Sequence, residues 1–465
     1  MATRILIPGG VLGLGFDPAA LATGVSHRPD AICIDGGSTD SGPFYLGAGT
    51  GKYSRESTRS EWRQLMIARA SLNVPLLLGS CGTCGTDNMV DWMFDLTNEL
   101  CAELGQSLTV VRLYSEQTND TLIDALNAGQ LQPLDAADNT PELTEASIRL
   151  CTHSVALAGA EPMIRALEMG ADIVLAGRAT DTAVIAALPL MRGEHAGAAW
   201  HGAKIGECGA LCSTHPTSGV IQIDFDDTGF TVVPLAESAR CTPHSVSAHM
   251  LYENADPIRL LEPGGVLDVS NACYHAIDEQ SVRVTGSQWQ AMTPYTVKLE
   301  GARAAGFQTL SLVLLREPRY VKHADAWVTR LSGFLTDEIQ SRMQLTPADF
   351  TLEFRIIGQN AVLGALETRQ GDPVEVGVML LVTSDTQLRA TEIARLANPF
   401  LLHYPLTDDE SLPTFAFACS PAESERGAVY EFALNHVMPL EDPLQAFRYE
   451  TTQLNTSHTG RVNAS

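Results

Sequence analysis

The chain has 465 residues, more than the roughly 250–300 residues at which one hydrophobic core stops growing, so we expect more than one domain. Hydrophobic residues make up 45% of the sequence and charged residues 18%, a composition that excludes a disordered chain. Acidic residues outnumber basic ones by 55 to 30, and the resulting net charge of −25 repels a phosphate backbone and argues against nucleic acid as a partner.

The sequence also indicates where the protein acts. Its longest apolar runs, at 74–79 and 171–177, are far shorter than the roughly 20 residues of a membrane helix. The first ten residues lack the basic flank and apolar centre of a signal peptide. We therefore expect a cytoplasmic protein with no membrane partner, whose ten cysteines are thiols rather than disulfides.

Residues 1–192 alternate short aliphatic runs with longer amphipathic segments, which predicts an α/β fold with a mostly parallel, doubly wound sheet. The expected strands are Arg4–Pro8, Asp30–Asp35, Val74–Gly79, Leu108–Tyr114 and Asp172–Gly177. The expected helices are Ser60–Leu72, Asn88–Leu104, Asp120–Ala128 and Glu161–Met169.

Residues 193–305 form a β-rich connecting segment that we expect to complete the site of the first domain. Alternating apolar residues at 219–224 and 230–234, separated by a short turn, predict a hairpin. Thr242 and Pro243 are typical of an N-cap and the first residue of a helix, here running to about Asn254. Strands are expected at 281–286 and 295–300.

Residues 306–450 have the order of a ferredoxin-like βαββαβ unit. Its expected elements are strand Thr309–Leu315, helix Lys322–Met343, strands Phe350–Ile357 and Val374–Thr383, helix Asp385–Ala397 and strand Thr414–Ala418. Residues 451–465 are expected to be a C-terminal tail.

Glycine-rich loops follow the expected strands of the first domain. Ligands of open α/β sheets bind beside the carboxyl ends of the strands, and glycines, hydroxyls and helix N-termini suit an anion there. We expect the loops at 36–42, 79–87 and 177–181 to converge on one pocket. The predicted substrate-binding residues are Gly37, Ser38, Thr39, Asp40, Gly82, Thr83, Asp87, Arg178 and Thr180.

Arg178 is the sharpest single feature, because a guanidinium at a strand end can grip a carboxylate or phosphate through two parallel hydrogen bonds. The alternative is a structural pair with Asp181 that holds the loop.

Candidate catalytic residues are Cys81, Asp181, Glu207, Lys298 and Glu300. Cys81 and Cys84 precede an expected helix, whose N-terminus favours the thiolate. Lys298 and Glu300 share one face of a strand and can flank a substrate.

No cofactor is predicted, and the glycine order at 10–15 departs from that of a dinucleotide-binding loop. A metal held by Cys81 and Cys84 with Cys208, Cys212 and Cys241 is an open alternative, although their spacing is not that of a zinc site.

Several longer runs resemble the acyclic terpene utilisation (AtuA-type) family over nearly the whole chain. The runs are Gly36–Pro43, Gly79–Thr83, Gly159–Pro162, Ala171–Asp181, Cys241–Asn254, Lys298–Gly301 and Ser420–Gly427. The resemblance implies a role in the catabolism of terpenoid acids, or more widely of carboxylic acids and acyl-CoA compounds. It supplies no set of catalytic residues.

Together these features predict a catabolic enzyme of lyase or hydratase type that acts on a small anionic carboxylic acid or its CoA thioester. The alternative is a non-catalytic subunit or scaffold whose ferredoxin-like region docks a small partner chain. We expect a homo-oligomer in either case.

Overall fold

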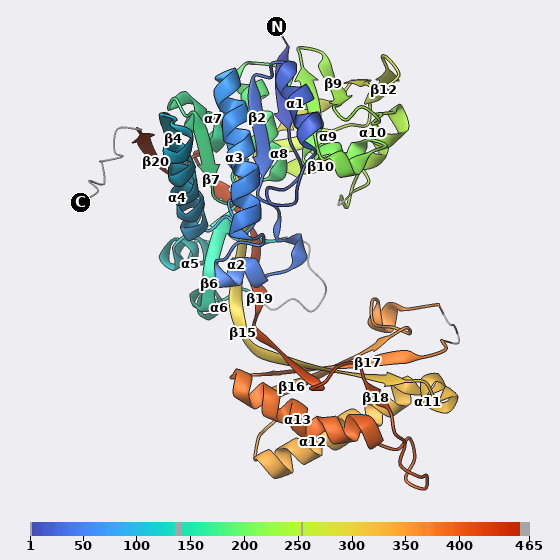
Figure 1. Ribbon diagram of the computed structural model, residues 1–465. Helices are drawn as coiled ribbons and strands as arrows, with labels where there is room; N and C mark the ends of the chain where they lie inside the picture. Colours follow the sequence, from blue (N-terminus) through green and yellow to red (C-terminus); the bar gives the residue numbers. More distant parts are fainter. Residues whose placement is uncertain (1, 135–141, 253, 370, 372, 456–465) are drawn as a thin grey trace, which may run out of the picture. The chain divides into compact units, whose positions relative to one another are not determined.

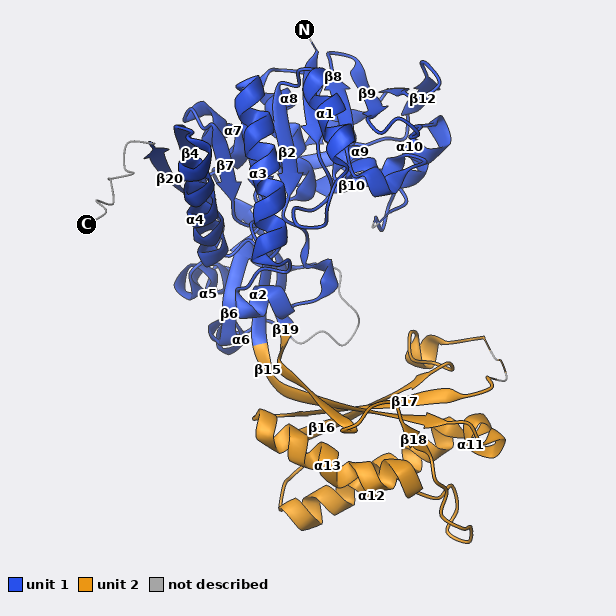
Figure 2. Cartoon of the chain, viewed as in Figure 1, with its two compact units in different colours: residues 1–303, 432–465 blue, residues 304–431 orange. Residues whose placement is uncertain are grey.

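The computed structural model describes residues 2–134, 142–252, 254–369, 371 and 373–455. The chain divides into two compact units, residues 1–303 with 432–465 and residues 304–431 (Figure 2). The expected connecting segment, 193–305, therefore belongs almost entirely to the first unit, and residues 432–450 return to it. None of the described helices is long and apolar enough to cross a membrane.

The first unit contains a ten-stranded mixed sheet in the order β12-β13-β9-β8-β1-β2-β3-β7-β4-β20. Strands β1, β2, β3, β7 and β4 pair parallel with one another, as the alternation of elements predicted. The strands of this sheet are β1 Thr3–Ile7, β2 Ala31–Asp35, β3 Leu76–Gly79, β4 Leu108–Tyr114, β7 Ile173–Ala176, β8 Ile221–Phe225, β9 Gly229–Pro234, β12 Cys273–Ala276, β13 Val282–Thr285 and β20 Arg448–Leu454.

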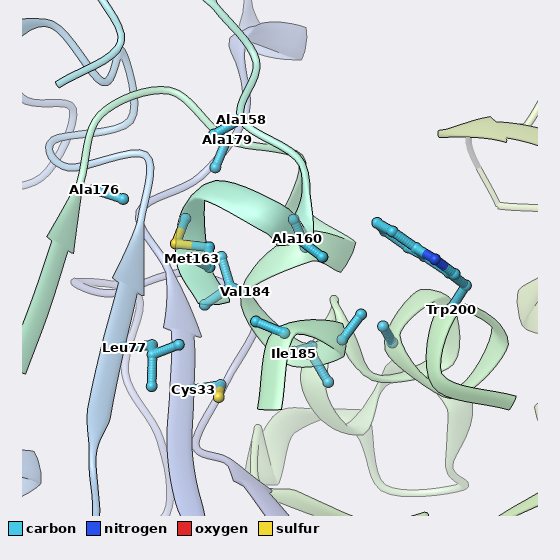
Figure 3. Close-up of a cluster of buried hydrophobic side chains, with 14 of the residues drawn as sticks. Cys33, Leu77, Ala158, Ala160, Met163, Ala176, Ala179, Val184, Ile185 and Trp200 are labelled. Atoms are coloured by element: carbon cyan, nitrogen blue, oxygen red, sulfur yellow. The ribbon is translucent and has the colours of Figure 1, made fainter. Parts of the chain in front are cut away.

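Helices cover both faces of this sheet (Figure 1). Residues of α1, α3 and α4 form one core with Leu6, Ile32 and Leu76, whereas residues of α7, α8 and α9 form the other core with Ile5, Cys33 and Leu77. Figure 3 shows part of the second core, including Val184 and Ile185 of α8. The helices are α1 Pro18–Ser26, α2 Phe44–Ala48, α3 Arg55–Leu72, α4 Asp87–Leu104, α5 Asn119–Asn127, α6 Glu145–Leu150, α7 Ala160–Glu168, α8 Asp181–Met191, α9 Ala196–Gly206 and α10 Pro243–His249.

Residues 193–305 were expected to form a segment separate from the first sheet, but the hairpin β8–β9 within them is part of that sheet. Strand β8 pairs antiparallel with β1, with Ile5 opposite Ile223, so it satisfies the hydrogen-bonding groups of an edge that would otherwise be open. The predicted start of α10 is confirmed, since Thr242 caps it in a reciprocal pair with Ser245 and Pro243 is its first residue. The helix ends at His249, earlier than expected.

The C-terminal residues also differ from the prediction. Residues 451–454, expected in a tail, belong to β20, which pairs antiparallel with β4. The rest of that predicted tail, 456–465, lies outside the described residues. Short remaining strands of this unit are β5 Gln132–Pro133, β6 Cys151–Ala156, β10 Arg259–Glu262, β11 Gly265–Asp268 and β14 Gln288–Ala291.

The second unit has helices on one face of an antiparallel sheet in which β17 lies between β16 and β15. Its elements are β15 Tyr295–Leu315, α11 Pro318–Lys322, α12 Ala324–Met343, β16 Phe350–Ile357, β17 Val376–Ser384, α13 Gln387–His403, β18 Ala416–Phe417 and β19 Glu423–Leu440, of which β15 and β19 belong partly to the first unit. The predicted strand 414–418 is reduced to the two residues of β18, beside Val313 and Leu314. The ferredoxin-like and doubly wound assignments stay predictions within this α/β architecture.

Candidate functional site

Three of the predicted glycine loops meet at the carboxyl ends of β2, β3 and β7. The N–H of Gly36 donates to the carbonyl of Gly79 at 2.9 Å, and the N–H of Ser80 donates to that of Gly177 at 3.0 Å. The hydroxyl of Thr83 donates to the carbonyl of Gly36 at 2.7 Å. A Cβ on Gly36 would lie 2.1 Å from the carbonyl oxygen of Ser80, so only glycine permits this approach.

Arg178 follows β7 and lies inside this junction. Its Nε donates to Oε2 of Glu300 at 3.1 Å, and its Nη1 donates to the hydroxyl of Ser80 and the carbonyl of Ala179, each at 3.0 Å. Only 4% of the residue is exposed. Nη1 also lies 3.6 Å from Oδ1 of Asp181. The guanidinium thus holds groups of the protein itself, including the pair with Asp181 that was the alternative interpretation.

Glu300 is the carboxylate that Arg178 holds, and it extends the cluster to β15. Its Oε2 also accepts from the hydroxyl of Thr39 at 3.1 Å, and its Oε1 lies 2.9 Å from Nζ of Lys298. Burial raises the pKa of Glu300, but the positive charges of Arg178 and Lys298 outweigh it and hold the pKa at about 2. Glu300 therefore stays ionised and is unsuited to donate a proton at neutral pH. Lys298, with 41% of its side chain exposed, reaches solvent.

A second group of charges lies next to the first through Asp181, the first residue of α8. Lys204 in the last turn of α9 forms a buried ion pair with Glu207, and Glu262 at the end of β10 accepts from the hydroxyl of Thr182 at 2.9 Å. The charge of Asp181 acts on Glu207 and Glu262, and that of Lys204 acts on Asp181. The predicted residue Thr180 caps α8 and bonds the hydroxyl of Thr182.

Burial shifts the carboxyl groups of this site toward their neutral forms. It raises the pKa of Glu262 to about 7, and it raises the pKa of Asp181 as well. The pKa of Glu207 and that of Asp35 at the end of β2 rise well above their ordinary values, first because of burial and then with the charge of Asp181. Carboxyl groups outnumber cations here, so it is costly for all of these carboxyl groups to be ionised together. The carboxyl groups are Asp35, Asp181, Glu207, Glu262 and Glu300, and the cations are Arg178, Lys204 and Lys298.

His249 adds a neutral polar group beside Lys204. It is 6% exposed, and its Nε2 has no hydrogen-bond partner among the described residues. Burial, together with the charge of Lys204, lowers its pKa to about 4. The imidazole is therefore neutral at physiological pH, with one buried ring nitrogen that lacks a partner among the described residues.

The cysteine predictions need correction. Cys81 is fully buried, and burial, followed by the charge of Asp35, raises the pKa of its thiol well above the ordinary value instead of lowering it. Burial also raises the pKa of Cys84. The desolvation of each thiolate outweighs the helix N-terminus. Within the described part of the chain, no group of three His, Cys, Asp or Glu residues could hold a metal.

The remaining predicted residues lie at the edge of the cluster or away from it. Gly37 donates its N–H to Oδ2 of Asp35 at 2.6 Å, while the half-buried Ser38 donates its hydroxyl to the exposed Asp40 at 2.6 Å. Asp40 is near enough for its charge to raise the pKa of Asp181. Gly82 packs against Met89.

Asp87 belongs to a different neighbourhood. Its N–H donates to Oε2 of Glu116 at 2.8 Å and its carboxylate pairs with Arg448. The structure thus brings Arg178, Asp181, Glu300, Lys298 and Glu207 together but places Asp87 elsewhere.

The sequence analysis missed Lys204 and Glu262, and it did not assign Asp35 or His249 to the site. The sequence positions of Asp35 and His249 could have suggested a place in the site, because Asp35 ends a predicted strand before a glycine loop and His249 lies on a predicted helix. Lys204 and Glu262 lie in no recognisable motif, and only the packing of α9 and β10 brings them to the cluster.

Comparison with known proteins agrees with the family resemblance seen in the sequence. The family model described as acyclic terpene utilisation family protein AtuA matches residues 82–408, well over half of the chain. No curated protein and no solved structure matches it. The chain belongs to the acyclic terpene utilisation (AtuA) family.

Proposed function

We propose that this family member is a catabolic enzyme of lyase or hydratase type, which removes or adds water on a small carboxylic acid or its CoA thioester. The observation that carries the proposal is Glu262, whose pKa of about 7 suits a group that both accepts and donates protons at neutral pH. Asp181, whose pKa is also raised, is the second proton-transfer group. Titratable groups with shifted pKa values cluster at catalytic sites.

The roles follow from charge and exposure. Glu262 takes a proton from the carbon next to the substrate carbonyl, and Asp181 gives a proton to the hydroxyl group, which leaves as water. The neutral His249 donates from Nε2 to the carbonyl oxygen where negative charge develops. Lys298, partly exposed beside Glu300, binds the substrate carboxylate. Arg178 positions Glu300 and does not touch the substrate.

Substrate binding is coupled to protonation in this arrangement. An anion that approaches the ionised carboxyl groups is repelled, but it is attracted by Lys204 and Lys298 once Glu262 and Asp181 carry protons. The anion therefore binds best when Glu262 is protonated, whereas proton removal needs Glu262 ionised, so binding should strengthen and turnover should decline as the pH falls through 7.

A groove gives room for the rest of the substrate. It has a volume of about 400 Å³, within the range of ligand pockets, and its lining includes Met292, Pro294, Tyr295 and Leu440. Tyr295 donates its hydroxyl to Oε2 of Glu161 at 2.7 Å. Burial, then Glu161 and Glu262, raise the pKa of Tyr295, so the groove reaches the vicinity of Glu262.

The test is turnover of hydroxy-, unsaturated and tricarboxylic acids and their CoA esters by the purified chain, followed by the loss or gain of water. With a substrate found, Glu262→Gln should lower kcat by about 100-fold or more, the usual worth of a general acid or base. Glu410→Gln is the matched control, since Glu410 is a partly buried, hydrogen-bonded carboxylate of the other unit and its loss should leave kcat unchanged.

Two results would contradict the proposal. One is the absence of turnover of the whole panel by folded protein. The other is full activity of Glu262→Gln on a substrate that the unaltered chain converts.

A further inference from the structure

Among the described residues of the second unit, helices pack on only one face of the sheet. Side chains of β15 and β17 alternate, and Val313, Val378 and Leu380 point to the core shared with α12 and α13. The opposite side chains are fixed by register, because Leu310 pairs with Leu381, Leu312 with Met379 and Ile357 with Gly377. We call this surface, made by Leu310, Leu312, Leu314, Met379, Leu381 and Ile357, the open face.

The open face is apolar where a solvated sheet face is usually polar. Leu314 is 40% exposed and Ile357 45% exposed, whereas Leu381 is 7% exposed and Leu310, Leu312 and Met379 are partly buried; no residue of the open face belongs to the core under α12 and α13. The antiparallel sheets that do face water alternate apolar and polar residues. An apolar sheet face of this kind is typical of a surface that another layer covers.

The charged residues beside the open face indicate which kind of partner covers it. On the adjacent strand β16, Glu353 and Arg355 project from the same face and pair at 2.7 Å, each about half exposed. One acid and one base make the β16 side of this surface neutral and self-complementary: a two-fold axis can set Glu353 of one copy beside Arg355 of the other. A basic or acidic partner would match a border of a single sign instead.

The net charge of the whole chain also favours this neutral surface as the contact between two copies. At −25, two copies repel each other, so any contact between them must avoid further negative charge. The open face does so, because its only charged neighbours on β16 are Glu353 and Arg355.

We propose that the open face is the interface of a homodimer, in which the sheets of two second units pack face to face about a two-fold axis. Sheets that pack in this way bring apolar side chains together about 10 Å apart, as in a β-sandwich. The proposal is independent of the chemistry of the first unit.

Sedimentation equilibrium of the full chain tests it. The unaltered chain should be dimeric, and Leu314→Glu should be monomeric. Leu388→Glu, which places the same charge at a 67% exposed leucine of α13, should stay dimeric. Glu353→Arg should weaken the dimer at least about tenfold through like charges across the axis, and the double variant Glu353→Arg/Arg355→Glu should restore it.

Circular dichroism would identify an unfolded Leu314→Glu, and the two charge variants decide the matter in that case. A monomeric unaltered chain at every soluble concentration would overturn the proposal, and so would a dimer that tolerates Leu314→Glu and Glu353→Arg. Stoichiometric occupation of the open face by a different, small chain would replace the homodimer by a complex with that partner.

Discussion

At the scale of single residues, the role of a side chain depends more on the groups it contacts in the fold than on its position in the sequence. Arg178 leaves a buried strand just before a helix N-terminus, which is where an anion-binding arginine is expected. Its guanidinium nevertheless holds Glu300, Ser80 and the carbonyl of Ala179. A buried arginine that neutralises a protein carboxylate stabilises the fold of the site, and only indirectly its chemistry.

Arg178→Lys should therefore destabilise the protein. A lysine keeps the charge but cannot reproduce the donors that reach Glu300, Ser80 and Ala179, so the loss of two charge-assisted bonds should lower the free energy of unfolding by about 3 kcal/mol or more. The matched control is Arg192→Lys, since Arg192 forms a partly exposed ion pair with Asp30. That change should cost less than about 1 kcal/mol.

Urea denaturation of both variants measures these differences. Equal, small losses for Arg178→Lys and Arg192→Lys would show that Arg178 does not hold the site together.

At the scale of elements, the site depends on the close approach of loops that follow different strands. Gly85, in the loop before α4, has a φ of +63°, and its carbonyl accepts the N–H of Arg178 at 3.0 Å. A Cβ at this position would lie 2.2 Å from the backbone nitrogen of Arg178. The loops after β3 and β7 can therefore touch only with glycine here.

Gly85→Ala should be far more costly than Gly105→Ala. Gly105, the residue that ends α4, has nearly the same φ of +65°, but a Cβ there meets nothing within 4 Å. Gly105→Ala should lower the free energy of unfolding by about 1 kcal/mol, the usual strain of alanine at positive φ. Gly85→Ala adds a backbone clash and should cost several times as much or prevent folding.

Thermal or urea unfolding of the two variants makes the comparison. If Gly85→Ala were no worse than Gly105→Ala, the contact between these loops would not be essential to the fold.

Much of the element order could be predicted from the sequence, because continuous apolar runs mark the buried parallel strands and glycines mark the loops after them. The predicted bounds of β4, Leu108–Tyr114, agree with the structure, and the three glycine loops meet as expected. Strand β20 was missed because its alternation of polar and half-buried residues resembles that of a solvated tail. Its place is set by the open edge of β4, far away in the sequence.

The charge cluster was less predictable than the loops, because it too depends on contacts between residues far apart in the sequence. Arg178, Asp181 and Glu300 lie in distinctive sequence runs, whereas Lys204 and Glu262 come from a helix and a short strand with no motif. Their convergence depends on long-range packing, which local patterns do not encode. The expected lowering of the pKa of Cys81 is not found, because burial, which decides the pKa of a thiol, is a property of the fold; its reactivity stays a prediction.

At the scale of the whole molecule, the charged groups are distributed differently in the two units. A chain of net charge −25 concentrates buried carboxyl groups in the first unit, where burial raises the pKa of Asp35, Asp181, Glu207 and Glu262, and keeps a neutral apolar surface on the second unit. The family match, residues 82–408, includes parts of both units: it contains Arg178, Asp181 and Glu262 and most of the second unit, but begins after Asp35 and Ser80. Association and acid–base chemistry are thus proposed for separate parts of one chain.

The central claim is that Glu262 gains and loses its proton near neutral pH inside this cluster. Carbon-13 NMR of glutamate side-chain carboxyls across a pH titration measures this directly, with Glu262→Gln to assign the signal. The account predicts one carboxyl that titrates at a pH of about 7 and is missing from Glu262→Gln. Because the folded pKa is raised, Glu262 costs stability as the pH rises through 7, so Glu262→Gln should also unfold at a higher urea concentration than the unaltered chain at alkaline pH and lose that advantage in acid. A Glu262 signal that titrates at the ordinary pKa of an exposed glutamate, about 4.3, would contradict the account.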